Sequence, residues 1–158
     1  MAFDLSSLVS QPVTEANATS IKPCPIGEYT ARIADLRSGE KVEDWFREVN
    51  TKRGPSLTIR IPCVILDENV RKELGRENII VNFDSWIDIG PSGSLATGEG
   101  VNVGIGRLRA AVGLNDPSVP FLFSQLPGAG PFKAKVDHRS DANDSSIKYA
   151  EIVRVSSL

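Results

Sequence analysis

The chain has 158 residues, of which 41% are hydrophobic and 24% are charged, which is the composition of one globular domain and excludes general disorder. Its formal net charge of −2 gives no support to a strongly basic nucleic-acid binder. We expect neither a membrane span nor a secretion signal, because no apolar run approaches a helix of about 18 residues and no charged-then-apolar leader is visible. The two cysteines, Cys24 and Cys63, are therefore expected to be reduced and buried in a cytosolic protein.

Residues 1–25 are rich in Ser, Thr, Ala and Pro and show no sustained period, so they predict an extended or flexible N-terminal arm. Pro12, Pro23 and Pro25 exclude a helix through most of this arm. Its first apolar side chains could form one short anchor, or the terminus could simply be mobile. These side chains are Phe3, Leu5, Leu8 and Val9. Residues 26–158 are expected to form the folded domain.

Three strands are predicted in the first half of the domain, at 28–34, 56–66 and 78–89, where apolar and polar residues alternate or β-branched and aromatic residues are dense. Pro62 cannot donate to a ladder, so it predicts an edge or a bulge within the second strand. The polar stretch 38–55 is predicted as a long loop joining the first two strands. A short helix or turn is expected at 69–75.

The strongest helical pattern lies at 102–113, where Asn102 can cap the first turn and apolar residues keep helical spacing up to Gly113. The last two strands are predicted at 132–139 and 147–155, joined by a polar turn. The order is therefore β-β-β-α-β-β. A five-stranded barrel with its helix between strands three and four is the arrangement of the oligonucleotide-binding fold. The predicted fold class is thus all-β with one short helix, preceded by the extended arm.

Little in the sequence points to an enzyme. The single histidine, His138, lies on the apolar-pattern face of its strand without a neighbouring nucleophile, so we expect a packed residue. Cys24, Cys63 and His138 lack the spacing of zinc ligands, and the glycines of 98–104 stand outside the βαβ unit that a dinucleotide loop requires. No catalytic residue, metal or cofactor is therefore predicted, and a hydrolase or nuclease is the weakest alternative.

Single-stranded nucleic acid is bound by cationic groups along a groove and by aromatic faces on which bases stack. The loop between the first two strands carries an aromatic and basic cluster, and the second and fourth strands carry outward cations. The candidate nucleic-acid-binding residues are Trp45, Phe46, Arg47, Lys52, Arg53, Arg60, Lys133, Lys135 and Arg139. The alternative for Trp45 and Phe46 is a buried loop anchor. Trp86 is interpreted as a core residue.

The segments 100–115 (GVNVGIGRLRAAVGLN), 131–139 (PFKAKVDHR) and 149–155 (YAEIVRV) resemble a family of small phage proteins usually described as single-stranded DNA-binding. The start of the first strand, Ile26-Gly27-Glu28-Tyr29, and Phe3-Asp4 are also similar to that family. The resemblance covers roughly residues 26–155. It implies an oligonucleotide-binding-like fold and a protein that coats single-stranded DNA during phage replication or recombination, in the cytoplasm of the bacterial host. The chain departs from many single-strand binders in lacking an acidic tail, because it ends Arg154-Val-Ser-Ser-Leu158.

Two functions from different classes therefore remain open. The first is a DNA-binding module, expected to self-associate as barrels of this type commonly do, with single-stranded DNA as its partner and no membrane. The second is a virion cement or decoration protein that clamps neighbouring capsid proteins with residues 1–25. The mild acidity of the chain and its Pro-rich arm favour the second.

Overall fold

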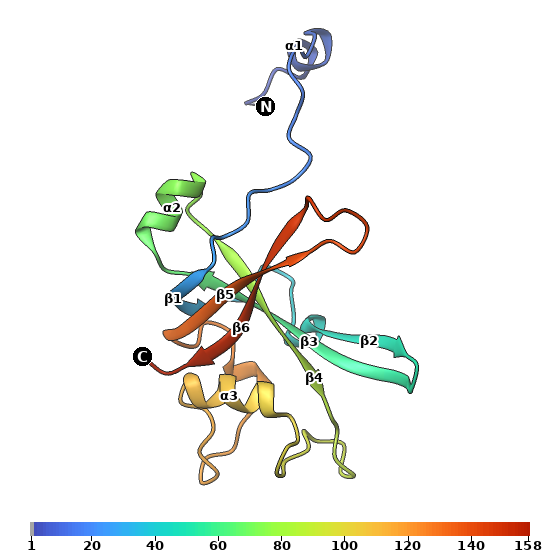
Figure 1. Ribbon diagram of the computed structural model, residues 1–158, viewed down its shortest axis with the longest axis vertical. Coiled ribbons are helices and arrows are strands. Elements are labelled where there is room, and N and C mark those ends of the chain that lie inside the picture. The colour runs from blue at the N-terminus through green and yellow to red at the C-terminus, as the bar shows by residue number, and fades with distance from the viewer. Residues whose placement is uncertain (1) are drawn as a thin grey trace.

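The computed structural model describes residues 2–158, so residue 1 of the predicted arm lies outside the described part. The fold is mostly β, with few and short helices (Figure 1). Its strands are β1 (Gly27–Ile33), β2 (Phe46–Thr51), β3 (Gly54–Ile65), β4 (Ile80–Ile87), β5 (Phe132–Ser140) and β6 (Lys148–Ser156). All five predicted strands are confirmed as β1, β3, β4, β5 and β6. They were predictable because a strand that buries one face has apolar residues at every second position.

The strands form one six-stranded sheet in the order β1-β5-β6-β4-β3-β2. An additional antiparallel pairing of β1 with β3 closes five of them into a ring, from which β2 projects as the outer strand of a hairpin with β3. Every pairing is antiparallel except that of β4 with β6, which is parallel and rests on a single residue pair, Asn82 and Glu151. The ring is therefore joined by longer ladders at three of its contacts, by three residue pairs between β1 and β3, and by one residue pair between β4 and β6.

The interior of the ring is filled by the inward residues of these strands. Ile33, Ile61, Cys63, Phe132 and Val136 have no exposed surface, which places the core between β1, β3 and β5. Cys24 and Cys63 are both free and buried, as predicted. Burial raises the pKa of the Cys63 thiol to about 12, since the charged thiolate is disfavoured away from water.

Pro62 lies inside the sheet and opposes Asn82 on β4, so the prediction of an edge or bulge was wrong. Its carbonyl oxygen accepts a hydrogen bond from the Ala34 amide at 2.9 Å. The amide and carbonyl groups of one strand residue point to the same side, so the missing amide hydrogen of Pro62 also faces this side. Here the ladder of β3 with β2 has ended and its ladder with β1 begins. A proline fits there because no ladder partner needs its donor.

Residues 2–158 contain three α-helices, α1 (Leu5–Ser10), α2 (Glu68–Leu74) and α3 (Val103–Ala111), where the sequence predicted one helix and a second helix or turn at 69–75. The helix at 69–75 is confirmed as α2, with Asp67 accepting from the Val70 amide at 3.0 Å as its cap. The arm is thus extended only in part, because α1 interrupts it. No helix within residues 2–158 has the length and apolar character needed to cross a membrane.

The stretch 38–55 was predicted as a loop, and this was wrong. It contains a 3₁₀-helix, η1 (Val42–Trp45), followed directly by β2. In a 3₁₀-helix, side chains three residues apart lie on one side. Val42 and Trp45 accordingly both turn inward and are buried.

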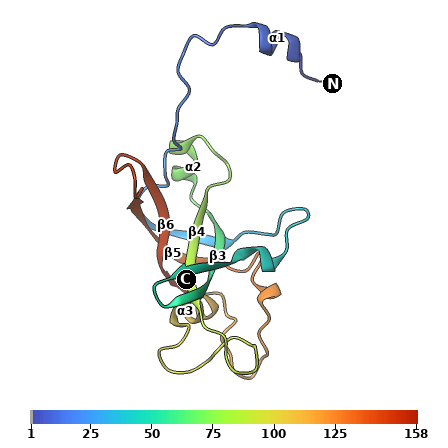
Figure 2. The same ribbon diagram turned by 90° about the vertical axis from the view of Figure 1, so that its right-hand side faces the viewer.

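Helix α3 lies across one end of the ring, between β4 and β5 in the chain, and contacts β4 and β6 (Figures 1 and 2). Gly104 permits this approach, because a Cβ there would lie 2.6 Å from Ser85 Oγ. Asn102 is the N-cap residue of α3, as predicted, but its backbone is left-handed at φ 52° and its side chain bonds no amide of the helix. The Asn102 amide group instead bonds the backbone of Asp88 and Ala96, which ties the 90–100 loop to β4. The predicted end at Gly113 is confirmed by its φ of 77°.

Candidate nucleic-acid interface

The outer face of β3 and β4 carries an exposed tryptophan beside an arginine. Trp86 opposes Thr58 on β3, and Thr58 in turn opposes Arg47 on β2, so the three side chains form one cross-strand row. Trp86 is 59% exposed, and the prediction that it belongs to the core was wrong. The physical reason is strand alternation: Ile79, Val81, Phe83 and Ile87 point inward, and the even-numbered residues between them point out.

The next outward pair along the same two strands is an ion pair. Arg60 Nε lies 2.9 Å from Asp84 Oδ1, and its Nη2 lies 3.5 Å from Oδ2. Both side chains are about half exposed, at 45% and 42%, so water screens their attraction and the pair contributes under about 1 kcal/mol to stability. A phosphate group can therefore compete with Asp84 for the Arg60 guanidinium at low cost.

The β5–β6 hairpin stands beside these residues and adds a second arginine with an aromatic ring. The guanidinium of Arg139 lies 5.8 Å from the centre of the Tyr149 ring, and its Nε lies 3.6 Å from Glu151 Oε2. The Tyr149 hydroxyl donates to Asp141 Oδ2 at 2.8 Å. This hydrogen bond raises the pKa of Tyr149 and lowers that of Asp141, where the Asn143 amide contributes most, so the phenol stays protonated and fixed.

These side chains line two hollows that share Arg60, Asp84 and Arg139. One hollow of about 680 Å³ lies toward β2 and Trp86, and the other, of about 410 Å³, lies toward the root of the arm. Together they make one surface depression, which we name the β3–β4 groove. Its cationic side chains are Lys22, Arg47, Arg60, Arg76, Arg139 and Lys148. Its carboxylates are Glu48, Asp84 and Glu151, so cations are in excess.

The groove brings together three of the predicted binding residues: Arg47, Arg60 and Arg139. Lys52 and Arg53 lie exposed in the turn between β2 and β3, at the end of the hairpin that forms one wall of the groove. They are close in sequence to the groove but do not line it.

The other four predicted residues lie elsewhere. Trp45 is only 4% exposed, so it offers no face to a base, and Phe46 packs edge-on against Phe123 at 5.2 Å. Both are loop anchors, the alternative weighed from the sequence. Lys133 and Lys135 point outward from β5 opposite Thr30 and Glu28 of β1, away from the groove lining.

Sequence reasoning missed the two exposed aromatic residues of the groove, Trp86 and Tyr149, which are 59% and 44% exposed. The signal for Trp86 was present in the alternation of its strand.

His138 was expected to be packed, and its Nε2 lies 2.7 Å from the carbonyl oxygen of Cys24. Among residues 2–158, no three His, Cys, Asp or Glu side chains are close enough to hold a metal ion.

Comparison of the chain with protein-family models and with curated proteins finds no match.

Proposed function

We propose that this chain is a single-stranded DNA-binding protein of the oligonucleotide-binding fold that holds DNA in the β3–β4 groove without sequence specificity. The fold part of the proposal is supported by the strand ring β1-β3-β4-β6-β5, with α3 between β4 and β5 and a parallel contact between β4 and β6. In such barrels the face of the second and third strands, here β3 and β4, binds oligonucleotides. The hairpins β2–β3 and β5–β6 then flank the ligand.

The observation that carries the functional part is Trp86, an indole exposed on a strand with Arg47 in its cross-strand row and Arg60 beyond it. A base can stack on the indole while the arginines contact the phosphates on either side. Stacking contributes about 1–3 kcal/mol per base and does not depend on base identity, because every base has a π-face.

The net charge of −2 does not oppose this proposal, because the excess of cations is local to the groove. The resemblance of residues 26–155 to phage single-strand binders agrees with it and supplies the role: coating DNA during replication or recombination in the host cytoplasm.

Fluorescence tests the groove directly, because the chain has only two tryptophans. Trp45→Phe leaves Trp86 as the sole indole and removes no hydrogen bond, since Trp45 Nε1 has no partner among residues 2–158. The emission of Trp86 in this variant should be quenched by oligo(dT) of about 20 nucleotides, which is longer than the largest site of one such barrel. Trp86→Phe, which leaves only the buried Trp45, should show little quenching and weaker binding.

Affinity should fall steeply with salt, as counterion release requires. Double-stranded DNA of the same length is the matched control and should bind more weakly. Binding of Trp86→Phe and wild-type protein with equal affinity would contradict the proposed site. An affinity that stays in the high micromolar range at low salt would contradict the function.

A second function, virion assembly, is favoured by one observation: residues 2–21 extend from the domain and are almost wholly exposed (Figure 2). A cement protein that clamps capsid neighbours would use such an arm. Deletion of residues 2–21 should then abolish attachment to capsids and leave the domain folded. A deletion variant that still decorates capsids would exclude this alternative.

A further inference from the structure

The N-terminal helix α1 is well formed but buries nothing. Asp4 caps it, since its Oδ1 accepts from the Ser7 amide at 3.1 Å. Leu5, Leu8 and Val9 lie at the i, i+3 and i+4 spacing of one helix face, and they are 52%, 73% and 83% exposed. A six-residue helix is only marginally stable alone in water, so its formation requires a surface that covers this apolar stripe.

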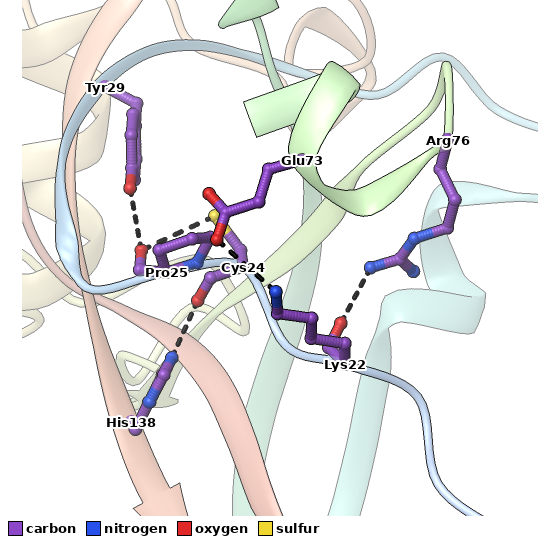
Figure 3. A network of polar contacts seen from close by, with 7 residues as sticks. All are labelled: Lys22, Cys24, Pro25, Tyr29, Glu73, Arg76 and His138. Carbon is purple, nitrogen blue, oxygen red and sulfur yellow. Dashed lines mark hydrogen bonds and ion pairs between the residues drawn. The ribbon is translucent and has the colours of Figure 1, made fainter. Parts of the chain in front are cut away.

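The root of the arm, in contrast, is fastened to the domain (Figure 3). The carbonyl oxygen of Cys24 lies 2.7 Å from His138 Nε2, that of Lys22 accepts from Arg76 at 2.9 Å, and that of Pro25 accepts from the Tyr29 hydroxyl at 2.9 Å. Cys24 is itself buried. The direction in which the arm leaves the domain is therefore set.

This exit point lies at one end of β4, because Ile21 and Lys22 line the same hollow as Ile80. At the other end of β4 is a second hollow of about 400 Å³, which we name the β4-end hollow. It is lined by the apolar side chains of Pro55, Leu57, Trp86, Ile87 and Ile89 and by the polar side chains of Ser56 and Asp88. Ile89 and Trp86 are 58% and 59% exposed, so their apolar surfaces are open to a partner.

The arm and the β4-end hollow are also complementary in charge. Residues 2–21 contain Asp4 and Glu15 and no lysine or arginine. The β2–β3 hairpin next to the hollow carries Arg47, Lys52 and Arg53 with one carboxylate, Glu48, and the hollow itself contains Asp88. The cations around the hollow thus outnumber the carboxylates three to two, which favours an acidic arm with an apolar helix.

We propose that α1 of one copy of this chain seats in the β4-end hollow of a second copy. The exit point and the hollow lie at opposite ends of β4, about 25 Å apart for a strand of this length, and the arm is directed away from the domain (Figure 1). Donor and acceptor are therefore different surfaces, and the contact is head-to-tail. Repetition of a head-to-tail contact gives an open chain of subunits.

The two sites share Trp86, whereas Ile89 lies in the β4-end hollow and outside the β3–β4 groove, so Ile89 is the position changed in the test. The inference is tested by sedimentation of the full chain without nucleic acid. The weight-average mass of the wild-type protein should rise with concentration above the 17.1 kDa of the monomer. Leu5→Ser/Leu8→Ser, which lacks the donor, and Ile89→Ser, which lacks the acceptor, should each stay at monomer mass.

An equimolar mixture of the two variants is the decisive sample. The intact arm of Ile89→Ser can enter the intact hollow of Leu5→Ser/Leu8→Ser, so the mixture should form dimers and nothing larger. Val13→Ser and Leu122→Ser remove equally exposed apolar side chains at 79% and 64%, outside α1 and outside the hollow, and should associate like wild type.

Three outcomes would overturn the proposal. A wild-type chain that stays monomeric at all concentrations would mean that the arm serves another partner, such as a capsid protein. A mixture that stays monomeric would mean that the arm folds back onto its own domain. Association of either variant to the wild-type extent would mean that other surfaces join the copies. All changed side chains are exposed, so unchanged circular dichroism should accompany each result.

Discussion

Neutralising Asp84 should increase the affinity for single-stranded DNA. Asp84→Asn keeps an oxygen that can accept from Arg60 but removes the negative charge next to the expected path of the phosphates. At a separation of about 6 Å in water, a carboxylate and a phosphate repel each other by about 0.7 kcal/mol, or roughly threefold in affinity. The water value applies because both Arg60 and Asp84 are nearly half exposed. Arg60, no longer paired with a carboxylate, also becomes available for about one phosphate contact. This contact makes the slope of log affinity against log salt concentration steeper by about 0.7.

The measurement is fluorescence anisotropy of a labelled oligo(dT) titrated with each protein at a series of salt concentrations. Asp84→Asn should bind about two- to fourfold more tightly at low salt, and the advantage should shrink as salt screens the charge. Glu99→Gln is the matched control, because it makes the same charge change at an exposed position outside the β3–β4 groove. Equal gains in both variants would show that net charge, and not Asp84, limits binding. Weaker binding by Asp84→Asn would refute the placement of DNA in the groove.

Three further predictions concern stability and the arm. Phe132→Ala should lower the free energy of unfolding in urea by about 3–5 kcal/mol, because the ring is fully buried, whereas Leu122→Ala at 64% exposure should stay within about 0.5 kcal/mol. The pKa of the Cys63 thiol is raised from 9.0 to about 12, so the folded state keeps this proton to higher pH than the unfolded chain does. The contribution of Cys63 to the free energy of unfolding should be constant below pH 9 and fall from there toward pH 12, and Cys63→Val should make the total fall in this range less steep. His138→Ala removes the contact to the Cys24 carbonyl, so limited proteolysis at residues 22–26 should become faster than in wild type; an unchanged rate would mean that the remaining contacts hold the root without it.

The sequence located the strands of the ring because each buries one face, and burial of one face imposes a period of two on the residues. It missed β2 for the same reason. Five of the six residues of β2 are exposed, so its sequence, FREVNT, carries no apolar alternation. Such a strand is specified by its ladder with β3 and not by a local pattern.

The two tryptophans show two limits of predicting side-chain exposure from the local sequence. Trp45 stands in a polar segment, and only the 3₁₀ turn that pairs it with Val42 directs it inward. Trp86 stands in an apolar segment, yet it falls on the outward positions of β4 with Asn82 and Asp84. The sequence left both exposure and burial open for Trp45, and it assigned Trp86 to the wrong environment, which its position within the strand would have assigned correctly.

The contact between β4 and β6 has a mechanical consequence. A single residue pair, Asn82 and Glu151, joins these strands, and both residues line the floor of the groove. Under the proposed function, DNA would lie over this contact, and a strand of DNA bound to both β4 and β6 would hold the two together. Bound DNA should then slow amide hydrogen exchange on both sides of the β4–β6 contact more than elsewhere.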